Sequence, residues 1–163
     1  MNKTLAMSAC ALIASACAGL AAAQTYPAKP VKFVLPFPPG GPTDILGRII
    51  GQKLNAQLGQ PVIPENKPGA GGNVGTEYAA KQPADGYTIV LVSPSLSISP
   101  GLYKKLGYDP VKDFAAISLV AQIPNVLLVH PSVPAKTLRE LVQLAKSKPG
   151  QLNFGSGGLG TSN

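Results

Sequence analysis

Glycine and proline gather in two loops of this sequence, and each loop comes just before a predicted helix. The first loop is Phe37–Thr43 (FPPGGPT), and the second is Gly69–Asn73 (GAGGN). Glycine lets a ligand approach the backbone closely, and the free N–H groups of a helix N-terminus attract anions. Hydroxyls follow at Ser93, Ser95 and in the segment 156–162. These residues predict a site that binds a small carboxylate through main-chain donors; the alternative is that the loops are only tight turns.

Residues suited to catalysis are sparse. The only histidine is His130, between Val129 and Pro131, which favours a strand end over a general base. The motifs G-x-S-x-G, H-E-x-x-H, S-x-x-K and the Walker loop are absent from the sequence. The segment Gly155–Gly160 fits G-x-G-x-x-G, but the sequence stops before the helix and acidic residue that a dinucleotide site needs. We therefore expect no enzyme activity and no cofactor; an exported hydrolase is the weaker alternative.

The composition narrows the function classes further. There are 14 Lys and Arg against 7 Asp and Glu, a net charge of +7, and the basic residues are scattered rather than clustered. Scattered charge does not predict nucleic-acid binding. With 45% hydrophobic and 13% charged residues, the chain is not a solvated disordered one. Two cysteines and one histidine cannot form a Cys₄ or Cys₂His₂ zinc site, and we expect no bound metal.

The first 23 residues have the pattern of a secretory signal peptide. Lys3 provides the positive start, an uncharged run of small and apolar residues continues to Leu20, and Ala21–Ala23 gives an A-x-A cleavage site before Gln24. Both cysteines, Cys10 and Cys17, would leave with it. The rest of the sequence contains no apolar run long enough to cross a membrane. The sequence therefore predicts a periplasmic protein.

Alternating strands and helices must position the two loops. Strands are predicted at 31–35, 87–92, 116–121, 126–129 and 152–154, with a short extended piece at 61–64. Helices are predicted after Thr43 and after Asn73, each of which would be the N-cap, and after Thr137, where T-x-x-E is a capping box. The segment 93–100 is expected to be a polar loop. This order favours an α/β fold with a mostly parallel sheet, in which ligands bind at loops after the carboxyl ends of strands.

Five spaced motifs resemble one known family, the Bug-type solute-binding receptors of tripartite tricarboxylate transporters. They are Val34–Asp44 (VLPFPPGGPTD), Asn66–Gly75 (NKPGAGGNVG), Asp85–Thr88 (DGYT), Leu102–Phe114 (LYKKLGYDPVKDF) and Pro149–Ser162 (PGQLNFGSGGLGTS). The resemblance covers the chain after the signal peptide, in order. Pro42 stands where the family commonly has glycine, and Gly107 where it commonly has proline.

The resemblance implies a type II periplasmic-binding-protein fold, in which two α/β lobes close on a small carboxylate such as a tricarboxylate, a dicarboxylate or an acidic amino acid. It also implies a monomer that delivers this ligand to membrane permease subunits. By position in the motifs, the ligand-binding residues are expected to be Phe37, Pro38, Pro39, Gly40, Gly41, Thr43, Asp44, Gly72, Asn73, Ser93, Ser95, Ser156, Gly157 and Thr161.

The length differs from that of the family, whose members are about twice as long. We expect a signal peptide at 1–23, the first lobe at 24–122 without its returning C-terminal segment, and the start of a truncated second lobe at 123–163. A non-functional truncated fragment of such a receptor is therefore the main alternative to a working one.

Overall fold

The computed structural model describes residues 26–161, so the predicted signal peptide lies outside the described residues. Three parallel strands form one sheet in the order β2-β1-β3, with β1 (Val31–Leu35) between β2 (Val62–Asn66) and β3 (Thr88–Val90). The register pairs Leu35 with Asn66, so β1 and β2 end at the same edge. The predicted α/β fold with a parallel sheet is confirmed.

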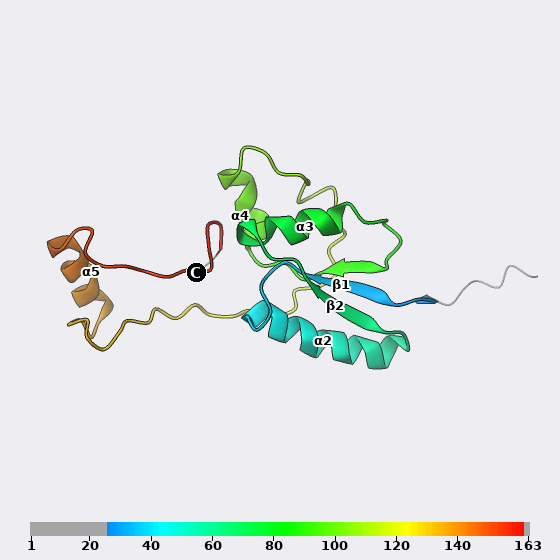
Figure 1. The fold of residues 1–163 in the computed structure, drawn as a ribbon, viewed down its shortest axis with the longest axis horizontal. Helices are drawn as coiled ribbons and strands as arrows, with labels where there is room; N and C mark the ends of the chain where they lie inside the picture. Colours follow the sequence, from blue (N-terminus) through cyan, green and yellow to red (C-terminus); the bar gives the residue numbers. More distant parts are fainter. Residues whose placement is uncertain (1–25, 162–163) are drawn as a thin grey trace, which may run out of the picture.

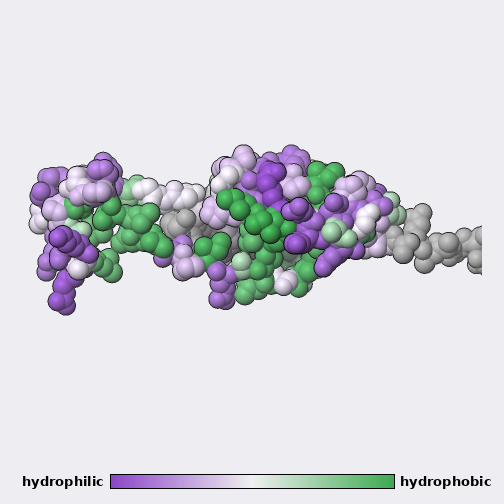
Figure 2. Space-filling view, turned by 90° about the horizontal axis from the view of Figure 1, so that it is seen from below, coloured by the Kyte–Doolittle hydropathy of each residue, from purple (hydrophilic) through white to green (hydrophobic). Residues whose placement is uncertain are grey.

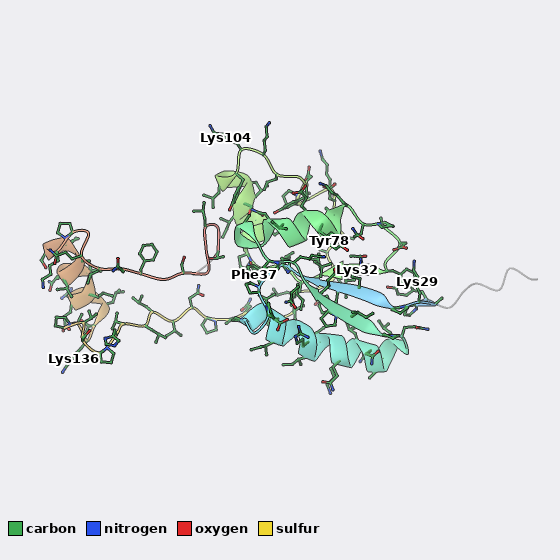
Figure 3. All side chains as sticks on the ribbon, viewed as in Figure 1. Lys29, Lys32, Phe37, Tyr78, Lys104 and Lys136 are labelled. Carbon is green, nitrogen blue, oxygen red and sulfur yellow. The ribbon has the colours of Figure 1, made fainter. Side chains whose placement is uncertain are left out.

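The sheet is covered by one helix on each face (Figure 1). Val31, Phe33 and Leu35 alternate along β1 and are buried against the partly buried side chains of α2 (Pro42–Leu58). Lys32 points to the other face, where its Nζ donates to the hydroxyl of Tyr78 in α3 (Asn73–Ala80) at 2.7 Å; Figure 3 shows this pair between α3 and the sheet. Successive side chains of β1 therefore point to opposite faces of the sheet, one covered by α2 and the other by α3.

The predicted N-caps of the first two helices, Thr43 and Asn73, are wrong by two residues and by one residue. In α2 the cap is Gly41 and Pro42 is the first helical residue, a position that suits proline because its missing N–H would have no helical partner there. In α3 the cap is Gly72, and Asn73 already lies in the helix. Helix α2 ends at Gly59, which adopts a left-handed φ of 67°.

The predicted polar loop at 93–100 is wrong, because most of it belongs to helix α4 (Ser95–Leu102). Ser95 and Ser99 are one turn apart and both are buried, whereas Ser97 is exposed. The buried positions of this helix are serines, so the pattern of apolar residues does not reveal it. Pro100 lies inside this short helix.

The predicted helix after Thr137 is confirmed as α5 (Leu138–Ser147). Thr137 Oγ1 accepts the N–H of Glu140 at 3.2 Å, as a capping residue should. The Glu140 carboxylate returns to the N–H of Lys136 at 2.6 Å, one residue earlier than in the usual capping box. The helix lies apart from the sheet (Figure 1), and no residue of α5 is buried.

The predicted strands at 116–121, 126–129 and 152–154 are wrong, because the structure has no strand there. Within residues 26–161, β1, β2 and β3 pair only with one another, so these segments have no neighbour to supply the backbone hydrogen bonds of a strand. Their apolar side chains are correspondingly exposed: Ile117 and Leu128 are each 83% exposed and Phe154 92%. Figure 2 shows hydrophobic surface along this part of the chain as well as on the face that carries α2.

Candidate functional site

The candidate site is built from loops that leave the carboxyl ends of the three parallel strands. The loop after β1 contains Phe37–Gly41 and leads into α2. The loop after β2 contains Gly69–Gly72 and leads into α3, and the loop after β3 contains Ser93 and leads into α4. All three strands run the same way, so the three loops meet at one edge of the sheet. Figure 3 shows Phe37 at this edge, beside the start of α2.

Asp44 joins the first loop to the rest of the fold. It is only 3% exposed, and its carboxylate accepts the N–H of Gly40 at 2.9 Å, the Nε–H of Arg48 at 3.0 Å and the Nδ2–H of Asn66 at 2.9 Å. These hydrogen bonds, with that from Arg48 the strongest cause, hold the pKa of the Asp44 carboxyl far below its ordinary value. Asp44 is therefore an ionised, fully engaged side chain at the base of the loop.

The second loop has an unusual backbone. Gly69, Gly71 and Gly72 have φ angles of 137°, 65° and 100°, and Ala70 between them has a φ of 48°, a region that side chains other than glycine avoid. A Cβ on Gly72 would lie 3.0 Å from Cζ of Phe37. The first two loops are therefore in direct contact, and the contact requires glycine at position 72.

Asn73 lies beneath the second loop rather than on its surface. It is 9% exposed, and its Oδ1 accepts the hydroxyl of Tyr108 at 2.7 Å. Tyr108 is itself buried, and this burial is the main cause that raises its pKa. Asn73 therefore links the first turn of α3 to the chain at Tyr108, directly after the glycine loop.

The serines of the third loop are arranged in a similar way. Ser93 Oγ lies 2.8 Å from Ser95 Oγ and accepts the N–H of Ser95 at 3.3 Å. Ser93 is partly exposed, whereas Ser95 is 4% exposed. Of these two predicted ligand residues, the structure leaves only Ser93 at the surface.

The last loop returns to the first part of the fold. A Cβ on Gly71 would overlap the carbonyl oxygen of Leu159, and a Cβ on Gly160 would lie 3.3 Å from Cδ1 of Leu102. Thr161 Oγ1 donates to the carbonyl of Gly158 at 2.7 Å and so closes the turn that precedes it. The structure thus brings 159–160 against the glycine loop and α4, whereas Ser156 and Gly157 are exposed.

The predicted residues divide into two groups. Exposed or partly exposed at the loop edge are Phe37, Pro38, Pro39, Gly40, Gly41, Thr43 and Ser93, and exposed or partly exposed in the last loop are Ser156, Gly157 and Thr161. Buried beneath the loops are Asp44, Gly72, Asn73 and Ser95. His130 is exposed in another part of the chain, with its Nδ1 2.7 Å from Ser132 Oγ.

Two residues of the site were missed from the sequence alone, Asn66 and Tyr108. Asn66 Nδ2 donates to the carbonyl of Phe37 at 3.0 Å as well as to Asp44. The signal for Asn66 was present, because a residue at the carboxyl end of one parallel strand lies beside the loop of the next. Tyr108 is 35 residues from its partner Asn73, and no local pattern predicts such a pairing.

Glycine loops at the carboxyl edge of a parallel sheet are typical of α/β proteins that bind a small ligand. The tripartite tricarboxylate transporter family receptor pattern matches residues 46–163, and the chain belongs to this family. BugT of Bordetella pertussis (strain Tohama I) is 40% identical over 151 residues, which cover 90% of this chain and 46% of that protein. The chain therefore spans just under half of this curated relative.

Solved structures of the same type support the fold. Rpa4515 of R. palustris, solved with adipate, is 37% identical with a TM-score of 0.79 over 83% of this chain and 46% of that one. MatC from Rhodopseudomonas palustris, solved with bound malate, is 33% identical with a TM-score of 0.66 over 75% of this chain and 42% of that one. The fold is that of the periplasmic binding proteins, and the chain corresponds to part of one.

Proposed function

We propose that the chain belongs to an extracytoplasmic receptor that captures a small carboxylate and delivers it to a tripartite tricarboxylate transporter permease. The observation that carries this proposal is the contact of Phe37 with Gly72, which joins two donor-rich loops at one edge of the sheet. Adipate and malate in two related structures support a carboxylate as the ligand class. The family consists of receptors rather than enzymes, which supports binding without turnover.

The backbone of the first loop limits which donors a ligand could use. Three of the seven residues at 37–43 are proline and have no N–H, and the N–H of Gly40 is bound by Asp44. The remaining amides are those of Phe37, Gly41 and Thr43. We propose these, with the partly exposed Ser93, as the ligand donors of this part of the receptor.

The remaining parts of the proposal concern the whole protein. We propose a signal peptide at 1–23, a first lobe at 24–122 and the start of a second lobe at 123–163, with the ligand held between the lobes by Ser156, Gly157 and Thr161. A periplasmic, monomeric receptor is the expected form. Within residues 26–161, no helix is both long and apolar enough to cross a membrane.

Isothermal titration calorimetry of the chain with adipate, malate, glutamate and citrate tests the proposal. We expect saturable heat with at least one of them and none with adipamide, the uncharged analogue of adipate. Absence of heat with all four acids would contradict binding by this chain and favour the non-functional fragment.

A matched pair of glycine variants locates the site. Gly72→Ala would require a left-handed φ of 100° for alanine and would crowd Phe37, whereas a Cβ on exposed Gly101 would have nothing within 4 Å. We expect Gly72→Ala to weaken binding about tenfold or more, as losing one good hydrogen bond to a charged ligand would, and Gly101→Ala to leave it unchanged. Equal affinities for the two variants would place the site away from these loops.

A further inference from the structure

The Asp44 carboxylate is buried, and N–H groups of the protein contact both of its oxygens. A carboxylate offers about four lone-pair sites. Oδ1 accepts from Arg48 Nε and Asn66 Nδ2, and Oδ2 accepts from Gly40 N and Arg48 Nε, all within 3.0 Å. Three N–H groups therefore contact the carboxylate, with the Arg48 Nε–H shared between its two oxygens, and Asp44 is only 3% exposed.

Asn66 extends this arrangement to the other end of the loop. Its Nδ2 donates to the Phe37 carbonyl at 3.0 Å, and its Oδ1 accepts from Arg48 Nη2 at 3.1 Å. Asn66 is the last residue of β2 and is paired in register with Leu35 of β1. The loop is consequently held at two points, the Phe37 carbonyl and the Gly40 amide, by groups that belong to α2 and β2.

We propose that Asp44 is a positioning residue for the first loop, Phe37–Gly41, and does not itself contact the ligand. Its carboxylate accepts the Gly40 N–H and the Asn66 side-chain N–H, and Asn66 in turn donates to the Phe37 carbonyl. These hydrogen bonds hold Phe37 against the glycine loop and keep the other amides of the first loop in one orientation. We call these hydrogen bonds of Asp44 and Asn66 to the first loop the anchor. The effect of the anchor on ligand binding rests on the proposed function, whereas the anchor itself belongs to the chain without ligand.

The anchor requires a carboxylate and not merely a side chain of the same shape. All three partners of Asp44 are donors. An amide at position 44 would offer one oxygen, and its NH₂ group would face a donor. Asp44→Asn therefore removes the anchor with almost no change of volume. Asp85→Asn is the matched control, because Asp85 also accepts a backbone N–H, that of Tyr87 at 3.0 Å, but lies on the exposed turn before β3.

The test compares the ¹⁵N-labelled chain with these two variants by NMR and calorimetry. We expect Asp44→Asn to speed hydrogen exchange at the Gly40 amide about tenfold or more and to shift the side-chain amide resonances of Asn66. Asp85→Asn should change neither. In the presence of adipate, Asp44→Asn should weaken binding about tenfold. Unchanged exchange at Gly40 would overturn the anchor.

The direction of the binding change separates the two possible roles of Asp44. If its charge faced the ligand, removing that charge would strengthen adipate binding, and that result would also overturn the proposal. If the wild-type chain bound no adipate, the proposed function would fail while the exchange measurement still decided the anchor. Should Asp44→Asn not fold, Asn66→Ala replaces it: faster exchange at Gly40 and a shifted Phe37 resonance support the anchor, and an unchanged spectrum around the loop refutes it.

Discussion

Replacing Gly47 by alanine tests how closely α2 packs on the sheet. Gly47 is buried on the side of α2 that faces β1, and a Cβ there would overlap Cδ2 of Leu35 and lie 3.0 Å from its Cδ1. Leu35 is fully buried and lies two residues before Phe37, where the first loop begins. The new methyl group therefore cannot be accommodated by moving an exposed side chain.

Gly51 provides the matched control one turn further along the same helix. It is also buried, but a Cβ there would lie 3.6 Å from the nearest atom, Cδ1 of Phe33, an ordinary contact. Both substitutions gain up to ~1 kcal/mol because alanine favours the helix more than glycine does. Only Gly47→Ala adds an overpacking cost of ~1–3 kcal/mol. The difference in the free energy of unfolding between the two variants should therefore be ~1–3 kcal/mol, with Gly51→Ala the more stable.

Urea unfolding followed by far-UV circular dichroism measures this difference. With the urea dependence of a small protein, it corresponds to a difference in midpoint of about 1 M. A Gly47→Ala variant as stable as Gly51→Ala would refute the close approach of α2 to Leu35.

Three further predictions concern other parts of the chain. The pKa of Asp44 is lowered in the fold, so its contribution to stability is present above the ordinary carboxyl pKa and is lost as the pH falls below it. The free energy of unfolding should therefore fall less steeply with decreasing pH in Asp44→Asn than in the wild type. An identical slope in both would count against an ionised Asp44 that holds the loop. Thr137→Ala removes the acceptor for the Glu140 N–H and should lower the stability of α5 by ~1 kcal/mol. NMR chemical shifts should show lower helicity at residues 138–141, and unchanged shifts would show that the cap contributes nothing. Export with processing after Ala23 should yield a periplasmic protein whose N-terminal sequence begins at Gln24, and a different first residue would contradict the predicted cleavage site.

The sequence predicted the elements whose stabilising contacts are local or lie between neighbouring strands. The strand at 31–35 has β-branched residues bounded by prolines, and α2 ends at a glycine that adopts the left-handed conformation. The capping threonine of α5 is likewise a local signal. Such features depend on few distant residues, and they were located to within one or two positions.

The errors fall where burial is polar or where pairing is distant. In α4 the buried positions are Ser95 and Ser99, so hydrophobic periodicity indicated no helix. The apolar runs at 116–121 and 126–129 have strand-like composition, but a strand also needs a partner, and the described residues supply none. Composition alone does not distinguish a paired strand from an unpaired extended segment with the same residue types.

Position in a motif does not show whether a side chain is exposed or buried. Motif position brought Asp44 and Asn73 into the set of ligand residues, because both adjoin donor-rich loops. In the structure both are buried, and each uses its side chain to hold a loop from beneath, Asp44 through Gly40 and Asn73 through Tyr108.

A loop held in this way can bind a ligand without first becoming ordered. The glycine loop has four consecutive residues with positive φ, and it is closed by the Gly72 N–H, which donates to the Gly69 carbonyl at 2.9 Å. Ordering a flexible loop would subtract from the affinity, so glycine angles already set before binding would remove that one cost in the proposed receptor. In the proposed receptor, the buried polar residues beneath the loops and the glycines within them would therefore have one common effect, which is to keep backbone donors in a fixed arrangement.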